Sequence, residues 1–221
     1  MKYFCCAAVL FFAAAQCAFA AAIEPNDPNS LLKARPEFRV RDSNDPNEML
    51  MNAWNAAINV LQAKDVNHKL KEKLIEKQIS PLFDFPLMAK LTLGRAHWPK
   101  LNPQQAGKFT RLFTKRLKDS YREKIMLYDD EKASLQPAVH GGRTLRIPMQ
   151  VISEEKTIAI LYKLRKKDKR WKIYDVEIEG VSILLTYRSQ FDDILRDGTV
   201  SDLLRRLENP EPLKDPAGPQ Q

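Results

Sequence analysis

The sequence predicts an α+β fold, with N-terminal helices packed on a curled antiparallel sheet of about four strands and a C-terminal helix after it. Before residue 128, apolar residues recur every three or four positions, the period of an amphipathic helix. Between residues 133 and 179 they alternate with polar residues, as in strands, and the turns between these segments are short. Short turns require antiparallel neighbours. Helices grouped before and after such a sheet are typical of the α+β class.

The N-terminal segment, residues 1–20, has the form of a secretory signal peptide. Lys2 precedes an apolar run over residues 3–15, and small-x-small cleavage motifs end at Ala20 and Ala22. An uncleaved membrane anchor is the alternative, although the run is shorter than the roughly 20 strongly apolar residues that span a bilayer. All three cysteines lie in this segment. An exported chain without cysteine fits the bacterial periplasm, where we expect the mature protein.

Polar, proline-broken sequence flanks the folded unit on both sides. We predict a flexible N-terminal arm over residues 21–47 and a disordered tail over residues 209–221. Residues 48–208 are then long enough for a domain with a substantial core, and we expect a monomer. The chain carries a net charge of +8.

Three helices are predicted before the sheet, over residues 48–64, 70–78 and 104–128. Asn47 is expected to cap the first helix, and Asn102, which precedes a proline, the third. The third helix has a basic face. We interpret it as a solvated helix face and expect no nucleic-acid binding, because the aromatic residues of this helix lie on its opposite side.

The segment of residues 80–102 is too rich in large apolar side chains for a surface loop, so it must be buried or face something apolar. Ser80 and Asp84 stand close to prolines and are candidate helix caps. Gly94 is expected to end its dense apolar run, which stretches from Phe83 to Leu93.

Four strands are predicted over residues 133–140, 143–152, 156–165 and 170–179. Pro148 lacks a backbone donor, so it should lie at an edge or a bulge. In the last strand the alternation breaks near Asp175, which indicates either two apolar faces or a bulge. Gly180 marks a corner, after which apolar residues at helical spacing predict the C-terminal helix.

The sequence offers little for catalysis. The three histidines lie in different elements without metal-ligand spacing, and neither a glycine-rich phosphate loop nor a Gly-x-Ser-x-Gly turn is present. Asp84, Asp175 and Asp192-Asp193 could in principle form a carboxylate pair, but a cap, a bulge residue and a helix face are the simpler interpretations. We therefore predict that the protein is not an enzyme and needs no cofactor or metal.

The excess of large apolar side chains favours a different kind of site. A cupped sheet closed by helices can leave an apolar cavity, the general form of a small-molecule site, although most of these side chains must pack against each other. The candidate lining residues are Phe85, Met88, Leu91, Trp98, Phe109, Phe113, Leu117, Tyr121, Leu145, Ile147, Met149, Ile160, Tyr162, Trp171, Ile173, Val176, Ile178, Val181, Leu184, Tyr187 and Arg188.

Several blocks of sequence carry a family resemblance. They are Phe83-Asp84-Phe85 with Met88, Leu93-Gly94 with Trp98, Gln105 ahead of Phe109 and Phe113, Trp171-Lys172-Ile173-Tyr174-Asp175-Val176, Gly180-Val181-Ser182, and Tyr187-Arg188-Ser189-Gln190-Phe191. In order and spacing they resemble the MlaC-like (toluene-tolerance) periplasmic phospholipid-binding proteins over about residues 48–208. A hopanoid-associated branch of that family is an alternative.

The resemblance implies a soluble carrier whose cargo is a phospholipid. It would exchange lipid with an outer-membrane lipoprotein complex and an inner-membrane ABC-transporter complex, and so maintain the lipid asymmetry of the outer membrane. Arg188 is then a candidate for holding an anionic head group, and the basic turn of residues 166–170 for docking. A carrier of another hydrophobic ligand, and an interaction or chaperone protein without a ligand, stay open.

Overall fold

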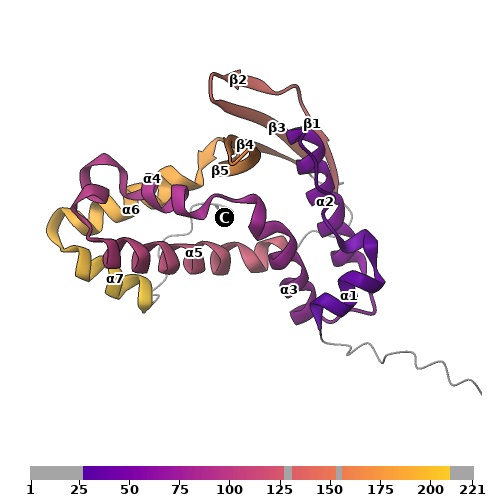
Figure 1. Cartoon of the computed structure of the whole chain (residues 1–221), viewed down its shortest axis with the longest axis horizontal. Coiled ribbons are helices and arrows are strands. Elements are labelled where there is room, and N and C mark those ends of the chain that lie inside the picture. Colours follow the sequence, from indigo (N-terminus) through magenta and orange to yellow (C-terminus); the bar gives the residue numbers. More distant parts are fainter. Residues whose placement is uncertain (1–26, 127–130, 153–155, 210–221) are drawn as a thin grey trace, which may run out of the picture.

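The computed structural model describes residues 27–126, 131–152 and 156–209. The expected signal peptide, the start of the expected arm and nearly all of the expected tail lie outside the described residues. In Figure 1 the strands lie together on one side of the molecule, and the long helix α5 runs along the opposite side. Helices α4 and α6 lie at one end and α1 to α3 at the other.

Residues 27–47 are folded, in contrast to the flexible arm that the sequence suggested. Helix α1 spans Pro28–Ala34 and the 3₁₀ helix η1 spans Pro36–Phe38. The Asp27 carboxylate caps α1 by accepting from the backbone N–H groups of Asn29 and Ser30. Phe38 is fully buried, and the guanidinium carbon of Arg35 lies 4.1 Å from the centre of its ring. Apolar burial of this kind outweighs the polar, proline-rich composition of the segment.

Helices α2 (Pro46–Gln62) and α3 (His68–Ile79) follow, contact each other and have capped N-termini. The cap of α2 is Asp45 and not Asn47, because Pro46 takes the first helical position, where its missing N–H costs nothing. Asn67 caps α3 through the backbone N–H of Leu70.

The apolar segment of residues 80–102 forms the 3₁₀ helix η2 (Ser80–Leu82), helix α4 (Phe85–His97) and the 3₁₀ helix η3 (Trp98–Lys100). Asp84 caps α4 as predicted, whereas the Ser80 side chain caps nothing. Gly94 interrupts α4 with a φ of +60°, a conformation that glycine adopts without strain.

Helix α5 (Pro103–Ile125) begins at the predicted cap. The Asn102 side chain accepts from the Gln105 N–H at 2.8 Å, and the Gln105 side chain accepts from the Asn102 N–H at 3.0 Å. This reciprocal pair is a capping box, which fixes the start of the helix.

The sheet is antiparallel throughout. Its strands are β1 (Lys132–Leu135), β2 (Val139–Gly141), β3 (Thr144–Ile152), β4 (Thr157–Lys167), β5 (Arg170–Ile178) and β6 (Val181–Ser182). They lie in the order β1-β3-β4-β5-β6, and β2 also pairs with β3. The first predicted strand is thus split in two. Pro148 lies opposite the split and accepts a hydrogen bond from the Gln136 N–H there, so its missing donor falls where the ladder is already interrupted.

A bulge in β5 explains the broken alternation near Asp175. Lys163 pairs with Asp175 and Leu164 pairs with Ile173, so Tyr174 is the extra residue. The β4–β5 hairpin turns at Asp168 and Lys169, both with positive φ, as in a type I′ turn.

The expected C-terminal helix is two helices, α6 (Ile183–Asp197) and α7 (Val200–Glu208). A Cβ on Gly198 would lie 2.7 Å from the Ile194 carbonyl oxygen, so the break requires a glycine. Thr199 and Asp202 then form a capping box that starts α7.

Buried apolar side chains form two clusters. The main core joins β3, β4 and β5 to α4, α5, α6 and α7, with the start of α2. The N-terminal core is smaller and consists of Leu32, Phe38, Val60, Leu61, Ala63, Val66, Leu70, Leu74 and Ile75.

Candidate functional site

One face of the sheet carries most of the strand residues that the sequence nominated. In the register of the sheet, Leu145, Ile147 and Met149 of β3 lie opposite Leu164, Tyr162 and Ile160 of β4. On β5, Ile173, Val176 and Ile178 lie opposite the same three β4 residues, and Trp171 continues the row at Lys166. Paired residues of an antiparallel sheet project to one side. We call this side the inner face, and it holds all nine nominated strand residues from Leu145 to Ile178.

Burial on the inner face is uneven. On β3, Leu145, Ile147 and Met149 are at most 1% exposed, so they belong to the packed core. On β4 and β5, Ile160, Tyr162, Trp171 and Ile178 are only partly buried although they contact the same cluster. The inner face therefore keeps accessible apolar surface along β4 and β5, where a hydrophobic ligand could be covered.

The nominated aromatic residues of α5 and α6 pack against each other. The ring centres of Phe109 and Phe113 are 6.1 Å apart, and Tyr187 stands edge-on to Phe113 at 5.4 Å. Trp98 contacts Phe109 edge-on at 6.5 Å. Such rings stabilise one another by contact. Met88, Leu117 and Leu184 are buried in the same core, whereas Phe85 and Tyr121 are partly buried at its edge.

Two nominated residues do not face the interior. Leu91 is 37% exposed, because α4 turns Met88, Ala89 and Leu93 toward the core and leaves Leu91 on its outer side. Val181 is 46% exposed at the start of the two-residue strand β6. Leu91 is therefore not part of the inner face, whereas Val181 pairs with Ile178 and extends the same side of the sheet at its exposed edge.

Arg188 lies on the surface of α6 and contacts the break in α4. Its side chain is 45% exposed and its Nε is 3.7 Å from the Asp192 carboxylate. A Cβ on Gly94 would lie 2.9 Å from an Nη atom of Arg188. The guanidinium thus lies over the bare glycine backbone, a helix–helix contact that the sequence alone did not reveal.

Two of the candidate carboxylates, Asp84 and Asp175, have structural partners. Asp84 accepts from Arg165 Nη2 at 2.6 Å and Nε at 3.1 Å, and from Lys167 at 3.3 Å, which ties the start of α4 to the β4–β5 hairpin. Burial would raise the pKa of Asp84, but the hydrogen bonds from Arg165, the Leu87 N–H and Lys167 outweigh it and hold the pKa below its ordinary value.

Asp175 joins the bulge of β5 to the start of α6. It accepts from the Val176 N–H, the Ser182 hydroxyl, the Leu184 N–H and Lys163, all within 3.2 Å. Both carboxylates therefore serve as anchors, in agreement with the simpler interpretations of the sequence. Within the described residues, no cluster of three or more His, Cys, Asp or Glu side chains could hold a metal ion.

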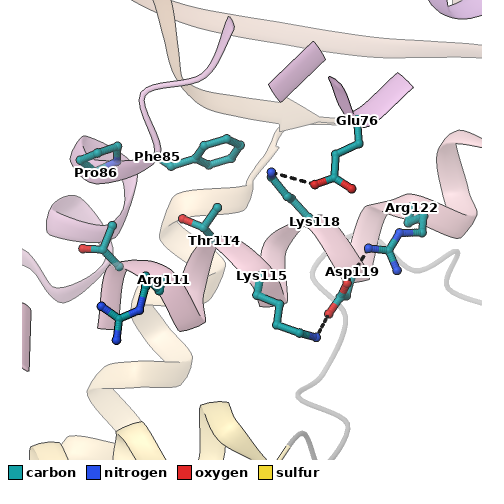
Figure 2. Close-up of a pocket in the computed structure, with 10 residues that line it drawn as sticks. Glu76, Phe85, Pro86, Arg111, Thr114, Lys115, Lys118, Asp119 and Arg122 are labelled. Atoms are coloured by element: carbon teal, nitrogen blue, oxygen red, sulfur yellow. Dashed lines mark hydrogen bonds and ion pairs between the residues drawn. The ribbon is translucent and has the colours of Figure 1, made fainter. Parts of the chain in front are cut away.

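The basic face of α5 meets other elements in a pocket of about 570 Å³, shown in Figure 2. We call it the α5 pocket. Its α5 wall is Thr110, Arg111, Thr114, Lys115, Lys118, Asp119 and Arg122, and its other wall is Glu76, Phe85 and Pro86. Of the nominated residues only Phe85 contributes. The helical periodicity of α5 could identify the basic face, but the wall opposite comes from residues at least 24 positions away.

Searched over the described ranges, the helices include none that is long and apolar enough to cross a membrane. The chain is similar to known proteins in sequence and in fold. It is 22% identical over 124 residues to the toluene tolerance protein ttg2D of Pseudomonas putida, which covers 55% of this chain and 58% of that protein. The chain thus matches somewhat over half the length of this relative.

A solved structure has the same fold. It is the phospholipid-binding protein from Ralstonia solanacearum in complex with a phospholipid, with a TM-score of 0.65 and 22% identity. The alignment covers 72% of this chain and 93% of that one. The model of the MlaC protein family matches residues 51–209, which include every strand and all helices from α3 onward. This chain therefore belongs to the MlaC family.

Proposed function

We propose that this protein is a periplasmic phospholipid carrier that holds the acyl chains of its cargo against the inner face of the sheet. The observation that carries the proposal is the partly buried apolar surface of Ile160, Tyr162, Trp171 and Ile178 beside a fully packed β3. Membership of the MlaC family and the bound phospholipid of the similar R. solanacearum protein support this choice of ligand.

The physical task of a carrier fits such a site. A two-chain phospholipid has on the order of 30 methylene groups, and each costs about 0.8 kcal/mol to expose to water. Free transfer through water is therefore very slow. A carrier has only to cover the chains, so it needs apolar surface and no catalytic group.

The expected partners follow from the same role. A carrier between two membranes collects its cargo at one and delivers it at the other, here an outer-membrane lipoprotein complex and an inner-membrane ABC-transporter complex. The net charge of +8 favours encounter with acidic docking surfaces or anionic lipids.

Native mass spectrometry of protein purified from periplasm without detergent, followed by solvent extraction, tests the proposal. We expect close to one two-chain phospholipid per chain. A bound polycyclic lipid would replace the phospholipid with a hopanoid as cargo. An empty protein that also takes no lipid from phospholipid vesicles would contradict the carrier role.

A further inference from the structure

We propose that the α5 pocket binds the phosphate of the lipid head group, while the acyl chains extend from it toward the inner face. This inference rests on the carrier function proposed above. Its evidence is the placement of cationic and hydroxyl donors on the α5 side of the pocket, and of Phe85 and Pro86 with one carboxylate, Glu76, on the other.

The donors form one stripe along α5. Arg111, Thr114, Lys115 and Lys118 occupy positions i, i+3, i+4 and i+7, which lie on the same side of a helix. In Figure 2 Thr114 and Lys118 extend from α5 toward Phe85, into the space between α5 and the start of α4. Thr114 and Lys118 therefore face the opposite wall of the pocket, whereas Arg111 and Lys115 extend to its open, solvent side.

The charge of the pocket favours an anion. Four cations, Arg111, Lys115, Lys118 and Arg122, stand against two carboxylates, Glu76 and Asp119, which leaves a net charge of 4 − 2 = +2. A phosphodiester carries a single negative charge. The pocket can therefore neutralise a phosphodiester without breaking the ion pairs of both Glu76 and Asp119.

Not all of the donors are engaged. Lys118 pairs with Glu76 at 2.9 Å, and Lys115 and Arg122 pair with Asp119 at 2.6 and 2.8 Å. Arg111 makes no ion pair or hydrogen bond with any described residue, and the same is true of the Thr114 hydroxyl. Exposed ion pairs contribute little stability, so a phosphate can also compete for Lys118 and Lys115. A guanidinium suits phosphate because it can donate two parallel hydrogen bonds.

Two stacked aromatic side chains, Phe85 and Phe83, link the pocket to the inner face. The Phe85 ring stacks on Phe83 with a centre-to-centre distance of 5.5 Å, and the Lys118 ammonium lies 5.3 Å from the centre of the Phe85 ring. Phe83 in turn pairs with Ile173, an inner-face residue of β5. A lipid with its phosphate at Thr114 and Lys118 can therefore run its chains past Phe85 and Phe83 onto the sheet, with Arg111 adding positive charge from the open side of the pocket.

The alternative is an ordinary solvated helix face with incidental ion pairs. It predicts that charge on this face is interchangeable with charge elsewhere. A charge-matched pair of variants separates the two ideas. The test variant is Arg111→Gln with Lys118→Gln, and the control is Arg95→Gln with Lys90→Gln, which removes one arginine and one lysine from the exposed side of α4.

The experiment incubates each full-length mature protein with phosphatidylglycerol vesicles and measures retained lipid by mass spectrometry after separation from the vesicles. We expect about tenfold weaker retention in the test variant, the effect of losing one to two charge-assisted hydrogen bonds, and wild-type retention in the control. The difference should shrink at high salt. The single variant Arg111→Gln, at an exposed position, should show part of the effect if the double variant folds poorly.

The outcomes separate this inference from the carrier function. Equal retention by wild-type, test and control proteins would leave the carrier intact and overturn the head-group site. A wild-type protein that retains no lipid but binds inorganic phosphate in calorimetry, with loss of binding in the test variant, would make the pocket a site for free phosphate and overturn both proposals. Loss of retention in test and control alike would indicate a general effect of charge and also overturn the head-group site.

Discussion

The main core and the N-terminal core both contain fully buried side chains, but they differ in the partly buried residues at their edges. The main core is bordered by partly buried aromatic residues, among them Phe83, Phe85, Tyr121, Tyr162 and Trp171. Among the described residues, the N-terminal core is bordered only by aliphatic side chains and a methionine: Leu31, Ile58, Ile79, Ile125 and Met126.

The family match sharpens this contrast. It begins at residue 51, so α1, η1 and the first residues of α2 lie outside it, and with them Leu32 and Phe38 of the N-terminal core. The inner face and the α5 pocket lie wholly within it. In the proposed carrier, the partly buried edge of the main core is where the ligand would bind, whereas the N-terminal core packs α1 and η1 against α2 and α3.

The largest effect is expected from Phe113→Ala in the main core. Phe113 is fully buried and contacts the rings of Phe109, Tyr187 and Phe191. Its loss should lower the free energy of unfolding by about 3–5 kcal/mol, because the surrounding rings cannot fill the cavity. Urea unfolding followed by circular dichroism measures the change. Phe113→Leu, which keeps most of the volume, should cost much less, and a loss under about 1 kcal/mol in Phe113→Ala would show that α5 and α6 are not locked together by these rings.

The matched change in the N-terminal core is Phe38→Ala. It should lower the free energy of unfolding by about 3 kcal/mol, since Phe38 is as buried as Phe113 but lies in a smaller cluster. The amount of lipid per folded molecule should stay at the wild-type level, which native mass spectrometry determines. Lipid loss in a Phe38→Ala protein that is still folded would contradict this difference between the two cores and would show that the N-terminal core takes part in ligand binding.

The sequence predicted the sheet and its irregularities well, because these depend on local patterns. Alternation located β3, β4 and β5 to within two residues, and the break near Asp175 is a bulge. The caps at Asp84 and Asn102 were also correct. Features that depend on contacts between distant residues were missed. Residues 27–47 fold because Phe38 finds partners on α2 and α3, which composition cannot indicate.

The candidate site was predictable only in part for the same reason. Register alone places the nominated strand residues on one face, but whether Ile147 or Ile160 stays accessible depends on how closely the helices approach each strand. Likewise, the basic stripe of α5 becomes one wall of a pocket only when the fold brings Phe85 and Glu76 opposite to it.

A smaller effect is expected from Asp84→Asn, which weakens the link between α4 and the hairpin at the edge of the main core. At neutral pH it should lower the free energy of unfolding by about 1.5–3 kcal/mol, the range for hydrogen bonds to charged groups. The pKa of Asp84 is lowered in the folded protein, so its contribution is present above the pKa of an unfolded aspartate, about 3.9, and is lost as the pH falls through the lower folded value.

Urea unfolding of wild type and Asp84→Asn between pH 7 and pH 2 checks this sign. The two free energies should differ at pH 7 and converge in acid. Asp65→Asn is the control in the N-terminal region, where the carboxylate pairs with Arg35 at 2.9 Å on the surface, and it should change stability little at any pH. A constant gap between wild type and Asp84→Asn down to pH 2 would mean that the Asp84 charge contributes nothing.

The smallest effect on stability, with a large effect on binding, is expected from Ile160→Asn on β4. Ile160 is partly buried on the inner face, so its polar replacement can reach water in the empty protein and should cost well under the 2–5 kcal/mol typical of a fully buried residue. Against bound acyl chains the amide loses that water, and lipid retention should fall about tenfold or more.

The contrasting change is Ile147→Asn at the fully buried position of β3, which should destabilise the fold strongly. Lipid retention after vesicle incubation, measured beside urea unfolding, distinguishes the two positions. Wild-type retention in a folded Ile160→Asn protein would remove β4 from the binding surface, and equal destabilisation by both changes would show that the inner face is packed evenly after all.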